Sequence, residues 1–472
     1  MAVTMTETFV TTEATGAWDN QRIVVAGMAR SGRAAARLLL AHGARVTITD
    51  LRSAEALELD EAAWRDAGFA LALGGHPDDL LDGADLLVLS PGIPKTASLV
   101  LDADRRGVPR LGEMEIAAQC AKAPMLAVTG TNGKSTVVTL TGGLLDAFGV
   151  ENAVAGNVGR ALSEVVETIP ASGVLAVEVS SYQLEDVDGF HPVGAALLNI
   201  TPDHLDRYDS LVHYGDTKWR LFDRQTADDV AVFPADNDAM RERAADLESR
   251  LVFFGDLRDG DMGAGVTDTS LVWRDQRGET EILGWDAFPL PGAHNRNNAA
   301  AAVALTSAAG IDPRAAETAR GLAAAKSLSH RLETVAVVGG VPCVDDSKAT
   351  NPESLEVALG SFDRPVILLA GGLPKDDDYG RLTPLLCAHA AEIVLIGDGE
   401  TKLSADWAST GLPIHKHGKD FPGAIRFGWE RARALGGVLL LSPGCASFDM
   451  FRDYEERGDR FAALVRQLED RG

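Results

Sequence analysis

The segment of this sequence richest in chemically capable residues is TGTNGKST (129–136). In a loop of this kind, glycines let backbone amides turn toward phosphate oxygens, while a lysine and a serine supply a cation and a ligand for Mg²⁺. Here these residues are Lys134 and Ser135, between the apolar run Met125–Thr129 and a helical pattern. The full P-loop pattern places a glycine at position 128, where this chain has Val128. We interpret the segment as a variant P-loop; the alternative is a glycine-rich turn with an incidental lysine.

Three further residues, Glu178, His204 and Lys218, could take part in metal-dependent chemistry. Glu178 ends an apolar run, and a carboxylate at the carboxyl end of a parallel strand lies where a P-loop domain binds magnesium. A helix-capping or ion-paired acid is the alternative. His204 lies in the polar segment NITPDHLDRY (199–208), where it could equally be an ordinary loop residue. Lys218 falls on a helix predicted over 214–222, and its type alone favours a solvated side chain.

The segment Gly27-Met-Ala-Arg-Ser-Gly32 is a weaker signal. It resembles the glycine loop of dinucleotide-binding domains, and Asp50 closes the next predicted strand, but Ala29 replaces the middle glycine. Because the chain has a separate P-loop, nicotinamide chemistry is disfavoured. Binding of some nucleotide diphosphate remains open.

The elements that must position these residues form a strand–helix alternation that starts three times along the chain. A helix is expected over 31–42, and the polar stretch over 255–286 suggests a small antiparallel excursion. Strands are expected at 22–27, 46–50, 85–90, 125–129, 174–178, 195–199, 365–370, 392–396 and 437–441. We predict an α/β fold with three domains in series. They are a Rossmann-like N-terminal domain (21–122), a central P-loop ATPase-like domain (123–329) and a Rossmann-like C-terminal domain (330–472), after a disordered leader (1–20).

Composition narrows the class of protein further. A net charge of −25 disfavours nucleic acid or an anionic membrane as a partner, because both require a basic face. The four cysteines are scattered without a CxxC pair, which fits a reducing cytoplasm better than a disulfide framework or a zinc site. The first 20 residues lack the basic and apolar regions of a signal peptide, and no apolar run approaches the length of a membrane span.

Eight segments, in a fixed order along the chain, resemble motifs of the Mur ligases and of their relatives, the folylpolyglutamate synthetases. They are TGTNGKST (129–136), GNVG (156–159), EVSSYQLE (178–185), NITPDHLDRY (199–208) with Lys218 downstream, GAHNRNN (292–298), HR (330–331), DDSKATNP (345–352) and LSPGCASFD (441–449). The resemblance covers nearly the whole chain from about Ile23. Within the family, the last two segments are typical of the branch that uses D-glutamate.

The resemblance implies a reaction. The carboxylate of UDP-N-acetylmuramoyl-L-alanine attacks the γ-phosphate of ATP, giving ADP and an acyl phosphate, and the amine of D-glutamate then displaces phosphate. The reaction belongs to peptidoglycan synthesis, and through it to cell-wall biogenesis, cell shape and cell division. The resemblance also implies a cytoplasmic monomer that acts on small molecules, with no nucleic acid or membrane partner. The three domains would then bind the UDP substrate, ATP and the amino acid, in chain order.

The resemblance also implies roles for individual residues. Lys134, His204 and Lys218 would be catalytic, and two Mg²⁺ would be held by Ser135, Glu178, His204 and Lys218, the lysine as a carbamate. The ATP-binding residues would be Gly130, Thr131, Asn132, Gly133, Lys134, Ser135, Thr136, Asn295, Asn298, Arg331 and Asp346. The UDP pocket would be lined by Ser31, Asp50, Arg52, Ser90 and Gly92, and the muramoyl–alanine end by Asn157, Ser180 and Gln183. D-Glutamate would be held by Lys348, Thr350, Ser447, Phe448 and Tyr454.

Two other functions fit these residues less well. A related ligase with another acceptor, such as a folate, is disfavoured by the D-glutamate segments and by the Rossmann-like first domain, which folate enzymes lack. A non-catalytic nucleotide-binding protein on the same scaffold should have lost at least one of Lys134, Glu178, His204 and Lys218, and all four are present.

Overall fold

The computed structural model describes residues 18–204, 207–326, 329–362, 364–374 and 378–469. They divide into two compact units. The first holds the described residues up to Ala287 together with Asn297–Ala324, and the second holds Phe288–Arg296 together with those from Ala325 onward. Residues 1–17 of the predicted leader lie outside the described residues.

The N-terminal sheet has the strand order β3-β2-β1-β4-β5, with every neighbouring pair parallel. Its strands are β1 Arg22–Ala26, β2 Arg45–Asp50, β3 Ala70–Leu73, β4 Leu86–Leu89 and β5 Arg110–Gly112. Alternate residues of β1 enter different cores: Ile23 and Val25 pack with helix α1 (Arg30–Ala41), whereas Val24 and Ala26 pack with α3 (Ser98–Arg106). The sheet is therefore covered on both faces, as its continuous apolar strands require.

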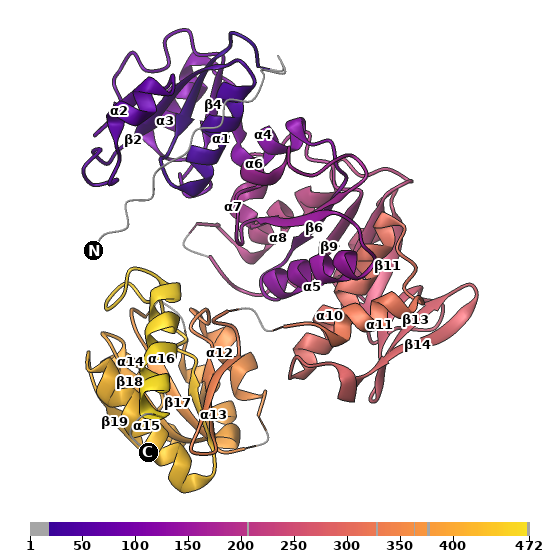
Figure 1. Cartoon of the computed structure of the whole chain (residues 1–472), viewed down its shortest axis with the longest axis vertical. Helices are drawn as coiled ribbons and strands as arrows, with labels where there is room; N and C mark the ends of the chain where they lie inside the picture. Colours follow the sequence, from indigo (N-terminus) through magenta and orange to yellow (C-terminus); the bar gives the residue numbers. More distant parts are fainter. Residues whose placement is uncertain (1–17, 205–206, 327–328, 363, 375–377, 470–472) are drawn as a thin grey trace. The chain divides into compact units, whose positions relative to one another are not determined.

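The central sheet carries the P-loop and has the strand order β14-β13-β12-β11-β10-β9-β6-β8-β7 (Figure 1). Its parallel strands are β6 Met125–Thr129, β7 Asn152–Gly156, β8 Val174–Glu178, β9 Gly194–Leu197, β10 Val230–Pro234, β11 Arg250–Gly255 and β12 Gly263–Val266. Strand β6 lies between β8 and β9, with Val128 opposite Glu178 and Thr129 opposite Leu197. The loops that follow these three strands therefore meet at one edge of the sheet.

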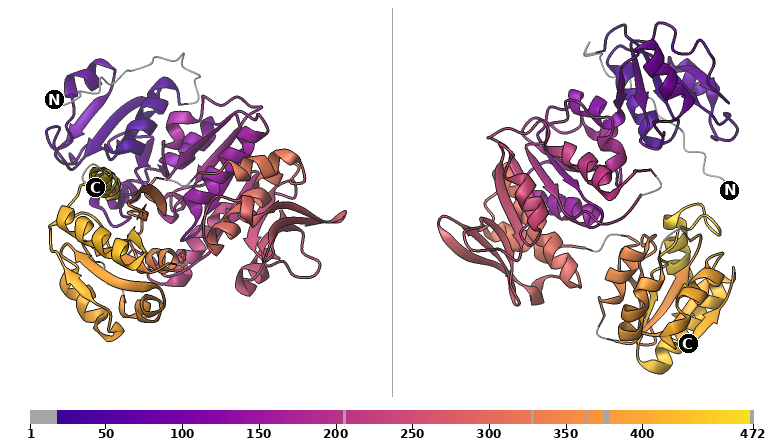
Figure 2. Two further views of the ribbon diagram at one scale, coloured as in Figure 1. Left: turned by 60° about the horizontal axis from the view of Figure 1, so that its bottom comes forward. Right: turned by 180° about the vertical axis from the view of Figure 1, so that it is seen from behind.

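The predicted antiparallel excursion is present but is part of this sheet. Strands β13 (Ser270–Asp275) and β14 (Gly278–Gly284) pair antiparallel with β12 and with each other, and form the extension coloured salmon in Figures 1 and 2. Strands β10 and β11 were not predicted, although both are apolar runs at the interior of the sheet.

The C-terminal sheet has the order β15-β16-β20-β17-β18-β19, parallel except for the β15–β16 pair. Its strands are β15 Glu333–Val338, β16 Val341–Asp345, β17 Val366–Gly371, β18 Ala390–Ile396, β19 Ile414–Lys416 and β20 Val438–Leu441. Asp345 lies opposite Leu441, so the segments that follow β16 and β20 are neighbours. These segments are the two that suggested D-glutamate.

The helices follow the predicted alternation. Those that bear on the site are α5 Lys134–Ala147, α7 Ser181–Leu184, α8 Leu211–Trp219, α10 Ala293–Thr306, α12 Pro352–Leu359, α15 Phe421–Leu435 and α16 Tyr454–Glu469. The helix predicted over 214–222 is α8 followed by a 3₁₀ turn, Arg220–Phe222. Within the described part of the chain, no helix combines the length and apolar character needed to cross a bilayer. The prediction of an α/β fold with three sheet-bearing parts in series is confirmed.

Candidate active site

The P-loop joins β6 to α5, and the segment that follows strand β9 holds it in shape. Gly130 and Gly133 have φ of +149° and +87°, in a region that side chains disfavour. The Oδ1 atom of Asn199, which follows β9, accepts hydrogen bonds from the amides of Thr131 (3.1 Å) and Asn132 (2.8 Å). A Cβ at Gly133 would lie 2.6 Å from Oδ1 of Asn298, so α10 closes one side of the loop.

Two lysines converge on this loop. Lys134 Nζ donates to the carbonyls of Gly130 (2.9 Å) and Thr131 (2.6 Å), and Lys218 Nζ donates to the same Gly130 carbonyl at 2.9 Å. Lys218 is 1% exposed and lies 4.4 Å from the centre of the Tyr214 ring. The expectation of a solvated lysine is therefore wrong at this position, because the face of α8 that carries Lys218 packs against the P-loop at the edge of the sheet.

Burial places the pKa of Lys218 well below its ordinary value, and the charge of Lys134 lowers it further. The carboxylates of Asp203 and Glu178 oppose the shift only in part. An amine that loses its proton readily is a nucleophile, and the neighbouring Lys134 places a cation beside it.

Glu178, at the end of β8, is 2% exposed. Its Oε1 accepts a hydrogen bond from Asn157 Nδ2 at 2.8 Å, whereas its Oε2 is buried with no hydrogen-bond partner among the described residues. A buried carboxylate oxygen without a donor is costly unless a cation satisfies it. The donor set therefore fits a magnesium ion, for which Ser135, also buried at the start of α5, offers a hydroxyl.

His204 lies in the loop after β9, with φ of +55°. Its Nδ1 is 2.9 Å from the hydroxyl of Tyr182, and its Nε2 is 3.6 Å from Oδ2 of Asp203. The next two residues of the motif, 205 and 206, lie outside the described residues. The aromatic rings of Tyr182, Tyr208 and Tyr214 cluster around this loop.

Ser180 and Gln183, predicted near the muramoyl–alanine end, form a capping box at the start of α7. The Ser180 hydroxyl and amide both lie 3.0 Å from Gln183 Oε1, and the amide of Gln183 donates to Ser180 Oγ at 3.3 Å. This motif fixes the turn after Glu178 and accounts for the residue types without a ligand.

The first glycine loop leaves no room for a side chain at Gly27 or Gly32. A Cβ at Gly27 would lie 2.6 Å from Ser90 Oγ, and one at Gly32 would lie 1.9 Å from the Gly27 carbonyl. Asp50 accepts from the Met28 amide at 2.8 Å and forms a two-pronged ion pair with Arg52. Burial opposes ionisation, but the hydrogen bonds from Arg52 and Met28 outweigh it and lower the pKa of Asp50 to about 2.

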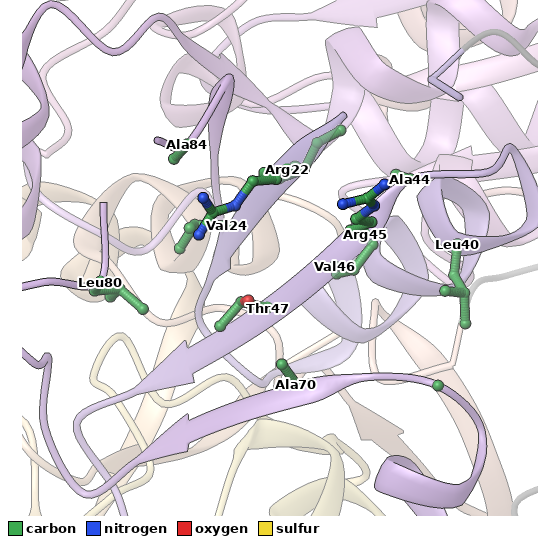
Figure 3. A pocket seen from close by; sticks show the side chains of 12 residues that line it. Arg22, Val24, Leu40, Ala44, Arg45, Val46, Thr47, Ala70, Leu80 and Ala84 are labelled. Atoms are coloured by element: carbon green, nitrogen blue, oxygen red, sulfur yellow. The ribbon is translucent and has the colours of Figure 1, made fainter. Parts of the chain in front are cut away.

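The structure thus brings Ser90, Asp50 and Arg52 to the carboxyl end of the N-terminal sheet, while Ser31 is the second residue of α1 and Gly92 follows β4. A cavity of about 360 Å³ lies at the other end of these strands. Figure 3 shows its lining, which includes Arg22, Arg45, Thr47 and aliphatic side chains. It contains none of the predicted substrate-binding residues. A larger cavity, of about 1100 Å³, includes Gly92 together with Lys95, Tyr182 and Arg207.

The second unit gathers another set of predicted residues. Asp346 follows β16. Its carboxylate accepts hydrogen bonds from the Ser442 hydroxyl at 2.8 Å and from the Leu332 amide at 3.2 Å. Burial raises its pKa to about 7, although the Ser442 hydrogen bond and the charge of Arg331 act against the rise. Arg331 lies between His330 and Leu332, both with positive φ. Asn295, near the start of α10, donates to the carbonyl of Pro291 at 2.7 Å.

The residues predicted to hold D-glutamate follow β16 and β20. Lys348 Nζ lies 5.6 Å from the centre of the Tyr454 ring, and the Tyr454 hydroxyl donates to Glu455 at 3.1 Å. Ser447 is buried and Phe448 is 69% exposed. Thr350 lies between Lys348 and the start of α12, a half-buried position.

Arg457, on α16, ties these two segments together and was not predicted. It is 1% exposed. Its guanidinium donates to the carbonyl of Ser347 at 2.8 Å, to Ser347 Oγ at 2.9 Å and to the carbonyl of Cys445 at 3.1 and 3.2 Å. A single arginine on an amphipathic helix gives no signal in the sequence. Asn199 was also missed, although its place in the polar segment after β9 was a signal that could have found it.

Comparison with known proteins defines the class. Three family descriptions match along the chain: "Mur ligase MurD-like, N-terminal domain" over 21–112, "Mur ligase middle domain" over 128–306 and "Mur ligase, glutamate ligase domain" over 330–445. The chain belongs to the Mur ligase family. It is 41% identical over 452 residues to the UDP-N-acetylmuramoylalanine–D-glutamate ligase of Geotalea daltonii, covering 95% of this chain and 98% of that protein. The ligase of the same name from a Geobacter species is 40% identical over 450 residues, with 95% and 98% covered.

Solved structures agree on the fold. UDP-N-acetylmuramate–alanine ligase MurC from Thermotoga maritima superposes with a TM-score of 0.57 at 17% identity, covering 95% of this chain and 100% of that chain. MurF from Acinetobacter baumannii gives a TM-score of 0.59 at 16% identity, with 95% and 94% covered.

Proposed function

We propose that this protein joins D-glutamate to UDP-N-acetylmuramoyl-L-alanine in an ATP-dependent reaction of peptidoglycan synthesis, releasing ADP and phosphate. The relatives that it matches over almost their whole length carry this activity in their names. The observation that carries the chemistry is the convergence of Lys134 and Lys218 on the Gly130 carbonyl.

The P-loop residues act on the triphosphate. The positive-φ glycines leave room for phosphate oxygens close to the backbone, and Lys134, released from the loop carbonyls, neutralises charge as one anion attacks another. Thr136 and the loop residues Thr131 and Asn132 shape the same cradle. Asn298 lies against Gly133 and is assigned with Asn295, Arg331 and Asp346 to the nucleoside.

Two magnesium sites are proposed, one at Ser135 and Glu178 and one at His204 and Lys218. Bound there, the ions would neutralise phosphate charge and orient the attacking carboxylate. Lys218 would serve as a carbamate formed with CO₂, which turns a buried amine into an oxygen ligand. The burial of Lys218 beside Lys134 supports this assignment, since an anionic group at Lys218 would lie next to a cation.

The remaining roles are the ones that the family resemblance implies. Asn157, bonded to Glu178, would hold the muramoyl–alanine end together with the capping-box residues Ser180 and Gln183. Ser31, Asp50, Arg52, Ser90 and Gly92 would bind the uridine diphosphate. Lys348, Thr350, Ser447, Phe448 and Tyr454 would bind D-glutamate, with the ammonium of Lys348 pairing with a carboxylate. We propose a cytoplasmic monomer whose partners are these small molecules.

The test is phosphate release from ATP and UDP-N-acetylmuramoyl-L-alanine, with D-glutamate, L-glutamate and meso-diaminopimelate supplied in parallel. Release with D-glutamate alone supports the proposal. Release with another amino acid would keep the ligase chemistry and overturn the assignment of Lys348 and Ser447. Release with none of the three would favour a non-catalytic nucleotide-binding protein.

A further inference from the structure

The hydroxyl of Tyr182 contacts the ring of His204, which the proposed function assigns to a metal site. The phenol oxygen lies 2.9 Å from His204 Nδ1, and the two ring centroids are 4.9 Å apart. Tyr182 comes from α7, directly after the Glu178 strand, whereas His204 comes from the loop after β9. The contact therefore joins the two loops that would carry the acidic and imidazole ligands.

Tyr182 is itself held in place by an ion pair. The guanidinium carbon of Arg207 lies 4.2 Å above the centre of the Tyr182 ring. Arg207 donates two hydrogen bonds to Glu185, at 2.9 and 2.7 Å, and both side chains are largely buried, at 15% and 9% exposed. Glu185 also accepts a hydrogen bond from the Tyr208 hydroxyl at 2.7 Å. A planar, two-pronged ion pair has little rotational freedom, so the tyrosine ring beneath it is fixed.

The two nitrogens of His204 have different surroundings. Nδ1 is within hydrogen-bond distance of the phenol, whereas Nε2 faces the Asp203 carboxylate at 3.6 Å. A histidine that binds a metal through one nitrogen needs a lone pair there and carries its proton on the other, where an acceptor fixes the ring. A tyrosine oxygen can be that acceptor.

We propose that Tyr182 is a positioning residue for His204: its phenol oxygen accepts the Nδ1–H and keeps the Nε2 lone pair directed to the cation site. The proposal rests on the proposed function for the role of His204. It extends that function by assigning the ring orientation to a relay of Glu185, Arg207 and Tyr182.

The direct test is ¹⁵N NMR of histidine-labelled full-length protein with Mg²⁺ and a non-hydrolysable ATP analogue. In the wild type we expect His204 to carry its proton on Nδ1. Tyr182→Phe keeps the ring and its contact with Arg207 but removes the hydroxyl, and it should abolish the single Nδ1–H form. Tyr208→Phe removes a hydroxyl that donates to Glu185 and not to His204. The two hydrogen bonds from Arg207 to Glu185 remain in that variant, so His204 should keep its proton on Nδ1.

The second readout is Mn²⁺ binding, measured by electron paramagnetic resonance under the same conditions. Loss of a group that orients a metal-binding histidine weakens metal affinity about 10- to 100-fold, and we expect a decrease of that order for Tyr182→Phe alone. A wild type with the proton on Nε2, or a Tyr182→Phe variant with unaltered His204 signals and Mn²⁺ affinity, would overturn the proposal. Failure of the proposed function would appear separately, as no phosphate release from the wild type.

Discussion

Replacing Arg457 with methionine should disturb the use of D-glutamate far more than it disturbs the fold. Arg457 joins Ser347, next to Lys348, to Cys445, two residues before Ser447. Methionine fills a similar volume but donates no hydrogen bond, so the two segments lose their common anchor while the helix keeps its packing.

The magnitudes explain why the fold is largely spared. Two backbone carbonyls lose their donor, at a cost of about 1–3 kcal/mol each. In the opposite direction, burial lowers the pKa of Arg457 to about 10. This shift corresponds to a cost of roughly 3 kcal/mol for burying the charged guanidinium, and the cost is absent for methionine. The two effects nearly cancel, and we expect a net loss of stability of about 1 kcal/mol, or a fall in Tm of about 3 °C.

The effect on catalysis has no such compensation. A displacement of about 1 Å in a substrate-holding segment can reduce a rate on the order of 100-fold. We therefore expect kcat/KM for D-glutamate to fall about 10- to 100-fold, while KM for ATP changes little.

The assay is steady-state phosphate release with D-glutamate varied at saturating ATP, together with thermal unfolding. Arg460→Met, the same substitution at an exposed position of α16, is the matched control and should leave both quantities near wild type. Arg457→Met with normal D-glutamate kinetics, or with a loss of stability above roughly 5 kcal/mol, would refute the reasoning.

Three other predictions follow from single positions. Lys218→Ala should lose most ligase activity and regain part of it when short-chain carboxylates are added to the phosphate-release assay; near-normal turnover without them would remove Lys218 from the reaction. Gly133→Ala places a Cβ 2.6 Å from Asn298 Oδ1 at a φ of +87°, so calorimetry should show about 10-fold weaker ATP binding, and unchanged binding would mean that the loop is not the ATP site. Burial raises the pKa of Asp346 to about 7, above its value of about 3.8 in the unfolded chain, so its contribution to stability is greatest at acid pH and is lost as pH rises toward 7. Asp346→Asn, which does not titrate, should therefore gain in Tm relative to wild type between pH 5 and 8, and a pH-independent difference would contradict this.

The elements around the phosphate loop could be predicted because each is a local pattern. An apolar run followed by glycines and a lysine specifies strand, loop and helix within about a dozen residues, and the structure has β6 and α5 at those positions. Glu178 could be placed for the same reason, as the acid that ends a buried strand. Strands β10 and β11 were missed because a short apolar run does not distinguish a buried strand from a helix segment. The domain boundaries and the residue roles stay predictions.

The sequence alone does not predict the surroundings of three residues, Lys218, Tyr182 and Arg457. Each takes its character from a partner far along the chain: Lys218 from the Gly130 carbonyl, Tyr182 from His204 and Arg457 from Ser347. Residue type favours an exposed position for a lysine or an arginine on a helix, and only the sheet order that brings β6, β8 and β9 together reverses that expectation for Lys218. The family motifs could assign Lys218 a role because the resemblance already carries that topology, whereas Tyr182 and Arg457 required the three-dimensional contacts themselves. Polar side chains that orient catalytic groups are therefore the part of such a site most dependent on a structure.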